Sequence, residues 1–386
     1  MTSRERLLTT LDGGQADRLP VTTHHIMPYF LDKYMNGINN EEFFDFFSMD
    51  AIDWVVPIKA DTDRGEYLDP SQGEPGFLQV SRVFSDNWRI ESENVPGTGY
   101  DTTRHTIVTP GGELSCVIQG NGYTEWVGEP LIKEKSDINL IAKYGTRPLC
   151  DTEKVRQSVL NIGERGIVRG FIIPFDIYGQ PGCWQDGCCI RGTENLIMDT
   201  FDDPVWVHEF LQVLLERKKP YVKSLEGSGY DVTELGGGDA STTVISPDIF
   251  NEFVAPYDKQ LIDEAQEVGI RIAYHTCGGM MPILEDLASM GPDALETFTP
   301  PEMGADVNLA EAKRRIGDKV CMIGGFNQVH YLLGCTEKAT RDYVRKCFDE
   351  AGGGGSYILA PSDHFFDADV NLLKVFADEA RKCLYC

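Results

Sequence analysis

From about residue 166 onward, short apolar runs alternate with longer segments of helical length. Most of the apolar runs end in Gly, Asp or Pro. This alternation is typical of βα units that feed a parallel sheet, because each strand needs a crossover segment before the next parallel strand can begin. The strands that we expect cover residues 168–175, 230–235, 270–277, 294–298, 320–323 and 357–360.

Consecutive units of this kind can close into a barrel or lie open. We expect closure, because glycines or polar residues end most of the strands, as they do where loops build a site at the C-terminal mouth of a barrel. Residues 52–57 are expected to form another strand of the same barrel. The sequence therefore predicts an α/β fold, a single (β/α)8 TIM barrel over residues 1–386.

The segment 82–122 has a different pattern. Its residues alternate between polar and apolar, and it is rich in Thr, Gly and Trp, which predicts β-hairpins. We expect a β-rich insertion at approximately residues 80–125 that lies as a flap over the barrel mouth. The chain carries no low-complexity linker and no repeat of solenoid period, which favours one domain with an insertion.

The charge balance narrows the choice of partners. The chain has 35 basic and 61 acidic residues, and its net charge of −26 would repel a nucleic-acid backbone and an anionic membrane alike. We therefore expect neither as a partner. No stretch approaches the length of a membrane span, so a cytoplasmic location is expected. Eleven scattered cysteines, an odd number, favour reduced thiols over a disulfide framework.

The most informative motif is Tyr274-His275-Thr276-Cys277-Gly278-Gly279, at the end of an expected strand. Side chains two positions apart point to the same side of a strand, so His275 and Cys277 can converge on one point. An imidazole nitrogen and a thiolate favour zinc over calcium or magnesium. The alternative is that Cys277 is a small buried apolar residue and His275 a hydrogen-bonded one, since two ligands do not make a site.

Other expected strands also end in groups that could join this site, because strand ends meet at the barrel mouth. Glu296 ends the next strand, and a carboxylate in a mostly buried strand must find a cation or hydrogen-bond donors. It is the expected third ligand, with His330, Asp363 and His364 as alternatives. Asp239 and Asn327 follow two further strands and are candidate catalytic polar groups, although such residues also cap helices and turns.

These residues carry a resemblance to a known family. The chain resembles the uroporphyrinogen decarboxylase superfamily, and most closely its zinc-dependent, corrinoid-linked methyltransferases. The resemblance covers most of the chain and implies a (β/α)8 barrel. Its most specific segments are Gly238-Asp239-Ala240-Ser241, Ile245-Ser246-Pro247, Phe250, Ala255-Pro256-Tyr257, His275-Thr276-Cys277-Gly278 and Ile323-Gly324-Gly325-Phe326-Asn327.

Two departures from the family pattern bear on the substrate. Decarboxylases carry an Arg-Gln-Ala-Gly-Arg motif that grips substrate carboxylates, whereas this chain has Thr22-Thr23-His24-His25-Ile26-Met27 in that region. Methyltransferases that act on coenzyme M add a zinc cysteine in a Gly-Cys-Gly stretch, whereas this chain has Ala360-Pro361-Ser362-Asp363-His364. Neither a tetrapyrrole decarboxylation nor methylation of that thiol is expected.

The resemblance implies a methyltransferase that demethylates a small methylated substrate, most often an aryl methyl ether, and hands the methyl group to cob(I)alamin. The chain has no Asp-x-His-x-x-Gly stretch to hold a corrinoid, so the partner expected is a separate corrinoid protein. A homodimer is the assembly considered. His24 and His25 are candidate proton donors, and Tyr29, Tyr178 and Trp184 are candidates for an aromatic substrate pocket, although each could equally serve in the core.

Three alternatives remain open at this point. The donor could be a methylated thiol or amine instead of an ether. The chain could be an atypical decarboxylase of the same fold. It could also be a non-catalytic barrel that binds a corrinoid protein or a small ligand, in which case zinc would be absent or fully ligated.

Overall fold

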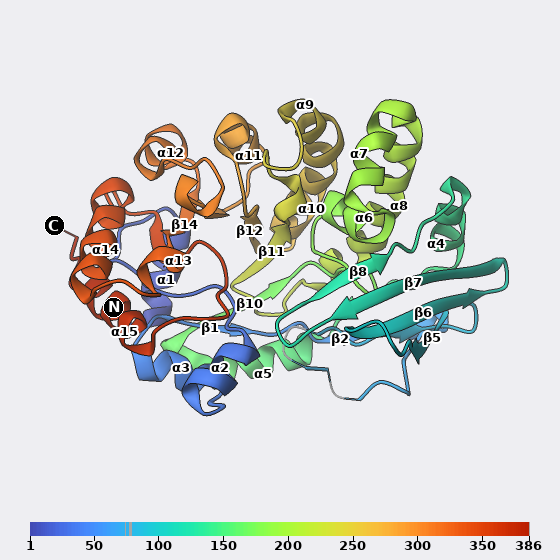
Figure 1. The fold of residues 1–386 in the computed structure, drawn as a ribbon, viewed down its shortest axis with the longest axis horizontal. Helices are drawn as coiled ribbons and strands as arrows, with labels where there is room; N and C mark the ends of the chain where they lie inside the picture. The colour runs from blue at the N-terminus through green and yellow to red at the C-terminus, as the bar shows by residue number, and fades with distance from the viewer. Residues whose placement is uncertain (74, 77–78, 386) are drawn as a thin grey trace.

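A curled sheet of parallel strands lies at the centre of the molecule (Figure 1). The computed structural model describes residues 1–73, 75–76 and 79–385. Seven strands pair side by side and every pairing in this sheet is parallel. In sheet order they are β1 (Ala51–Trp54), β10 (Gly166–Phe171), β11 (Val232–Gly236), β12 (Arg271–His275), β13 (Ala294–Thr297), β14 (Cys321–Phe326) and β15 (Tyr357–Pro361).

A short extended segment around Val21 closes this sheet into a barrel. Val21 forms a parallel bridge with Leu359 of β15. On its other side, the backbone nitrogen of Asp50, just before β1, donates to the carbonyl of Val21 at 2.8 Å. The segment therefore fills the position between β15 and β1, and the predicted (β/α)8 barrel is confirmed.

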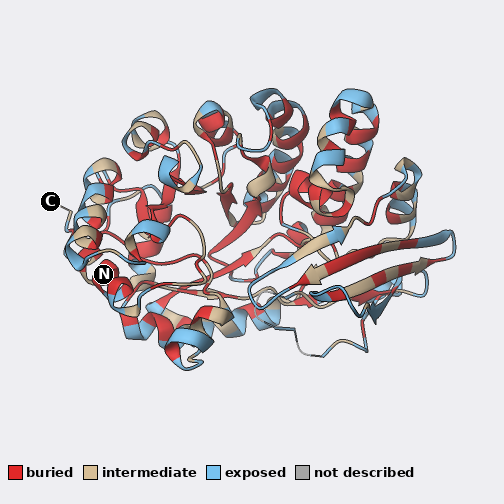
Figure 2. Ribbon diagram, viewed as in Figure 1, coloured by how far each residue is buried: buried red, intermediate tan, exposed pale blue. Residues whose placement is uncertain are grey.

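Helices pack on the outside of the barrel and bury their apolar faces against it. The barrel strands are therefore mostly buried, whereas most helices carry both buried and exposed residues (Figure 2). The helices of the N-terminal half are α1 (Ser3–Leu11), α2 (Pro28–Met35), α3 (Asn40–Phe47), α4 (Ile138–Tyr144), α5 (Thr152–Ile162), α6 (Cys183–Arg191) and α7 (Thr193–Asp202). Those that follow are α8 (Pro204–Ser224), α9 (Pro247–Ile249), α10 (Ala255–Glu267), α11 (Leu284–Ser289), α12 (Leu309–Ile316), α13 (Gln328–Tyr331), α14 (Glu337–Ala351) and α15 (Val370–Ala380). None of the helices in the described part of the chain has the length and apolar character needed to cross a membrane.

Local signals explain where several elements stop. The strand expected over 168–175 ends at Phe171, shortly before Pro174, which has no backbone N–H to give to a sheet. α7 and α8 are separated at Asp203, whose side chain accepts from the backbone nitrogen of Trp206 and starts α8, with Pro204 at its first turn.

The predicted flap is a four-stranded antiparallel sheet that lies beside the barrel mouth (Figure 1). It consists of β5 (Arg89–Asn94), β6 (Asp101–Thr109), β7 (Gly112–Gly120) and β8 (Glu125–Glu129), so it extends slightly beyond the expected 80–125. Two short pairs, β2 (Ile58–Lys59) with β9 (Leu149–Cys150) and β3 (Tyr67–Leu68) with β4 (Val83–Phe84), connect it to the barrel. At the flap tip, the hydroxyls of Tyr123 and Tyr29 lie 3.1 Å apart.

Asp50 ties the closing segment to the rest of the barrel. Its fully buried carboxylate accepts from Arg6 at 2.7 Å, from both terminal nitrogens of Arg18 at 3.0 Å, and from the backbone nitrogen of Val21 at 2.9 Å. Removal of its charge would leave buried guanidinium groups without a full counter-charge.

We predict that Asp50→Asn lowers the free energy of unfolding by about 3 kcal/mol, the cost of breaking a buried ion pair. Urea denaturation followed by circular dichroism measures it. Asp263→Asn is the matched control, because Asp263 is exposed and its ion-pair partner among the described residues is Lys259, and it should change stability by less than about 0.5 kcal/mol. If the two substitutions changed the free energy of unfolding equally, Asp50 would not stabilise the closing segment around Val21.

Candidate active site

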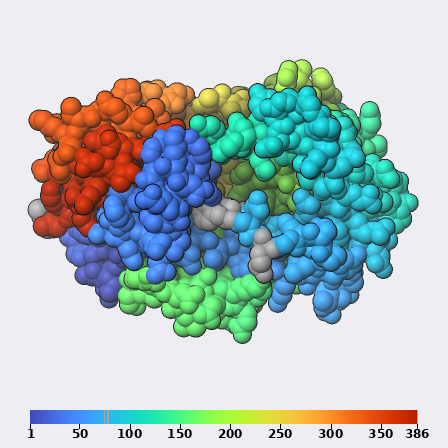
Figure 3. Space-filling view, turned by 60° about the horizontal axis from the view of Figure 1, so that its bottom comes forward, coloured from blue at the N-terminus to red at the C-terminus, as the bar shows by residue number. Residues whose placement is uncertain are grey.

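A cavity opens at the C-terminal mouth of the barrel, between the N-terminal segment and the flap, and this face of the molecule is visibly hollowed (Figure 3). The flap contributes Thr124 and Val127 to its wall, and Pro130 follows directly after β8. The titratable side chains that line the cavity are His24, His25, Tyr178, Cys188, Cys189, Glu234, Asp239, His275, Cys277, Asp363 and His364.

Three of these groups form a candidate metal site. The ligand atoms of His275, Cys277 and Asp363 all lie within 4.8 Å of one another. His275 ends β12, Cys277 follows two residues later, and Asp363 lies just after β15, so barrel closure brings the pieces together. Gly238 makes room for the thiol, because a Cβ atom at that position would lie 2.8 Å from the sulfur of Cys277.

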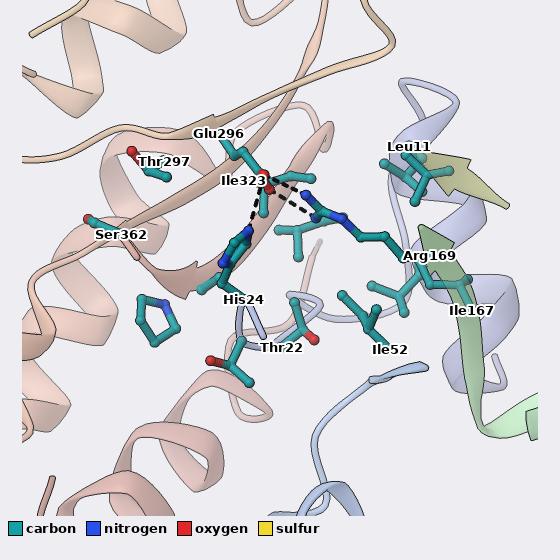
Figure 4. A pocket seen from close by; sticks show the side chains of 16 residues that line it. Leu11, Thr22, His24, Ile52, Ile167, Arg169, Glu296, Thr297, Ile323 and Ser362 are labelled. Carbon is teal, nitrogen blue, oxygen red and sulfur yellow. Dashed lines mark hydrogen bonds and ion pairs between the residues drawn. The ribbon is translucent and has the colours of Figure 1, made fainter. Parts of the chain in front are cut away.

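Beneath this site, a buried arginine joins two carboxylates, and Figure 4 shows its contact with one of them, Glu296. Arg169, on β10, donates to both oxygens of Glu296 at 2.5 and 2.9 Å and to Glu234 at 2.7 Å. Its guanidinium also lies 4.3 Å from the centre of the Trp54 ring. Burial alone would raise the pKa of Glu296, but the charge of Arg169 and the hydrogen bonds to His24 and His275 together hold that pKa well below its usual value. Arg169 is thus the cation that a buried carboxylate on β13 requires.

The two carboxylates in turn hold two histidines. Nδ1 of His275 lies 3.1 Å from Glu296, and Nε2 of His24 lies 3.1 Å from Glu234. Burial would lower the pKa of His24, but its hydrogen bonds to these carboxylates raise it above the usual value. The second nitrogen of His24, Nδ1, is buried and has no hydrogen-bond partner within the described chain.

The other predicted site residues occupy different places. Asp239 lines the cavity, where its carboxylate accepts from Gln185 at 2.9 Å and from Thr193 at 3.1 Å. Asn327 lies outside the cavity lining and caps α13, accepting from the backbone nitrogen of His330 at 2.9 Å. His330 itself is exposed on α13, away from the cluster at the mouth.

The three aromatic candidates also lie in different places. Tyr178 lines the cavity, and its hydroxyl donates to the carbonyl of Glu125 on the flap at 3.0 Å. Tyr29 lies at the rim, in contact with Tyr123 at the flap tip. Trp184 is fully buried and donates to the carbonyl of Asp239 at 3.1 Å, so it supports the site from the core and does not line the cavity.

Sequence reasoning missed two residues of this site, Arg169 and Glu234. A signal exists for both, because each is a charged residue within an apolar run that forms a buried strand. Such residues must be paired, which points to a buried ion network.

Comparisons with known proteins agree with this architecture. A family model described as uroporphyrinogen decarboxylase (URO-D) matches residues 185–382. A solved methyltransferase from Methanosarcina mazei has the same fold, with a TM-score of 0.60 over 99% of both chains at 14% sequence identity. That likeness concerns the fold alone.

Curated relatives include both methyltransferases and decarboxylases. The methylated-thiol–coenzyme M methyltransferase of Methanosarcina mazei is 24% identical over 41% of this chain and 40% of its own length. The methylcobamide:CoM methyltransferase of Methanosarcina barkeri is 27% identical over 39% and 41%. The uroporphyrinogen decarboxylase of Alcanivorax borkumensis is 25% identical over 56% and 62%. The matches thus span between two fifths and somewhat over three fifths of these relatives.

We predict that Arg169→Met lowers the free energy of unfolding by about 3–5 kcal/mol, because it leaves two buried carboxylates without their cation. Urea denaturation measures the loss. Arg314→Met is the matched control, since Arg314 is exposed and forms an ion pair with Glu311, and it should cost less than about 0.5 kcal/mol.

A second substitution tests the cause of that loss. Adding Glu296→Gln to Arg169→Met removes one of the two uncompensated charges and should restore part of the stability. A double variant that is less stable than Arg169→Met alone would contradict the charge-pairing account.

Proposed function

The chain belongs to the uroporphyrinogen decarboxylase (URO-D) family, and we propose that within this family it is a metal-dependent methyltransferase. In this proposal it removes the methyl group of a small methylated substrate, with an aryl methyl ether as the expected class. It hands that group to cob(I)alamin on a separate corrinoid protein. The observation that carries the proposal is the cluster of His275, Cys277 and Asp363 on the wall of the mouth cavity.

The donor set fits a catalytic zinc ion. One imidazole nitrogen, one thiolate and one carboxylate are three protein ligands, which leaves a position for a substrate in a tetrahedral site. We assign the third ligand to Asp363 and not to Glu296, because both oxygens of Glu296 already accept from Arg169. Glu296 instead orients His275 through Nδ1, which leaves Nε2 for the metal.

The lining of the cavity favours methyl transfer over decarboxylation of a polycarboxylate. Within the described chain, the residues that line it include no Arg or Lys, but they include Glu234, Asp239 and Asp363. A substrate with several carboxylates would meet like charges there. Met27, Val127 and Pro130 add apolar surface against which an aromatic ring could pack.

The chemical difficulty in this reaction is the poor leaving group. The methyl–oxygen bond breaks with its electron pair left on the oxygen, and the methyl group forms its new bond with the electron pair of cob(I)alamin. Bound zinc would supply a Lewis acid for that oxygen. A ligand set with one thiolate leaves more positive charge on the ion than a set with two, which suits an oxygen donor.

The chain's own residues orient the ligands and line the cavity. His275, held by Glu296, and His24, held by Glu234, keep fixed orientations at the cavity floor. Nδ1 of His24 has no hydrogen-bond partner among the described groups, so it can hold an electrophile that stabilises the negative charge developing on the leaving oxygen. In the simplest form of the mechanism this electrophile is a proton, which His24 donates to that oxygen. Thr124 and Val127 of the flap form one wall of the cavity together with Tyr178, which is hydrogen-bonded to the flap.

We predict that Cys277→Ala loses the bound zinc and the ability to methylate cob(I)alamin, while the protein stays folded. Elemental mass spectrometry measures zinc per chain. The visible spectrum of cobalamin reports methyl transfer from a panel of methoxylated aromatics, with methylated thiols and amines as comparison donors. Cys189→Ala is the matched control, because Cys189 lines the same cavity but belongs to none of the described metal-ligand clusters. Full activity of Cys277→Ala would refute the proposal.

The identity of the third ligand has its own test. Asp363→Asn removes a carboxylate ligand and should reduce zinc affinity by more than about 100-fold, whereas Glu296→Gln disturbs only the orientation of His275 and should cost about 10–100-fold. Competition with a chromophoric chelator measures both affinities. If Glu296→Gln strips the zinc and Asp363→Asn does not, the assignment of the two carboxylates is reversed.

A further inference from the structure

A second group of potential ligands lies beside the first, on the same cavity wall. The ligand atoms of His24, His25 and His364 lie within 4.8 Å of one another. The imidazoles of His24 and His25 have centroids 4.4 Å apart, and those of His25 and His364 are stacked at 4.9 Å. Imidazole is the protein ligand that divalent transition metals bind most often, and three imidazoles converge here.

His24 is prepared as a ligand in the manner typical of metal-binding histidines. Its Nε2 lies 3.1 Å from the carboxylate of Glu234, which is itself held by Arg169. Such a carboxylate fixes the tautomer and the ring orientation and leaves the other nitrogen free to bind. That other nitrogen, Nδ1, is buried without a hydrogen-bond partner in the described chain, and the His24 side chain is 8% exposed. A buried nitrogen with no partner is costly unless a ligand satisfies it.

Asp363 lies between the two groups. Its Oδ1 is 2.9 Å from Nδ1 of His364 and 3.9 Å from Nδ1 of His24, while the same side chain belongs to the cluster with His275 and Cys277. A carboxylate has two oxygens and can bind one metal ion with each. The rings of His24 and His275 have centroids 5.1 Å apart, so the two groups of ligands adjoin.

From this geometry we propose that the mouth holds a second divalent transition metal ion, bound by His24, His25 and His364 and bridged to the first site by Asp363. The two sites differ in chemistry, because the first contains a thiolate and the second contains only nitrogen and oxygen. The inference rests on the proposed function for the first site. In the mechanism proposed above, Nδ1 of His24 held a proton; here it would hold a metal ion, which would act beside zinc as a second Lewis acid for the leaving oxygen.

Cobalt(II) is a suitable probe because it takes the place of zinc and reports its ligands in the visible spectrum. The protein is stripped with a chelator and titrated with cobalt(II), and bound metal is counted by elemental mass spectrometry. The wild type should bind two equivalents. His25→Ala/His364→Ala should bind about one equivalent fewer, while the thiolate-to-cobalt band from Cys277 remains.

Matched variants separate this proposal from the first site. His330→Ala removes an exposed histidine on α13 and should leave the cobalt count unchanged. His364→Ala alone is a milder form of the double variant, because His364 is 31% exposed, and it should weaken the second equivalent if the double variant does not fold. Circular dichroism verifies folding in each case.

The two proposals fail in distinguishable ways. A histidine double variant that binds as much cobalt as the wild type would overturn the second site, and the zinc site at Cys277 would be unaffected. Loss of the thiolate band is tested separately with Cys277→Ala. If that variant still binds cobalt that His25→Ala/His364→Ala cannot bind, the second site is supported independently of the first.

Discussion

The buried ion network around Arg169 is the constraint on which the rest of the site depends. Its guanidinium, on β10, joins Glu234 of β11 to Glu296 of β13, and these carboxylates hold His24 and His275. A charged residue in a barrel core is costly unless it is fully paired, and here both carboxylates and the Trp54 ring provide that pairing. One cation on one strand therefore sets the orientation of two imidazoles that come from opposite sides of the mouth.

This arrangement combines a floor built by the barrel with a cover built by the flap. The floor consists of strand ends, whose positions are fixed by the closed barrel. The cover is the flap, which meets the barrel through polar contacts of Tyr123 and Tyr178. In the proposed reaction the flap side would admit the substrate and the corrinoid partner, while the floor would hold the metal. The acidic lining and the lack of a described Arg or Lys on the cavity wall are consistent with a neutral methylated substrate.

Patterns local to one strand could be predicted from the sequence, and pairings between strands could not. Alternating strands and helices indicated the barrel, and the spacing of His275 and Cys277 placed two groups on one side of a strand end. The same reasoning required a cation near Glu296 but could not identify Arg169, which lies 127 positions away. Nor could it separate Trp184, which packs in the core, from Tyr178, which lines the cavity, because both are aromatic residues close to a rim. Asn327 shows a similar limit, because a sequence does not distinguish an asparagine that caps a helix from one that takes part in catalysis.

The most direct test of the account is X-ray absorption at the zinc edge of the purified wild-type protein. We predict one sulfur ligand at about 2.3 Å, nitrogen and oxygen ligands at about 2.0–2.2 Å, and a change in the light-atom ligands when a substrate with a methylated oxygen is added. A zinc environment without sulfur would contradict the role of Cys277. Four protein ligands that do not respond to substrate would indicate a structural ion and contradict a catalytic one.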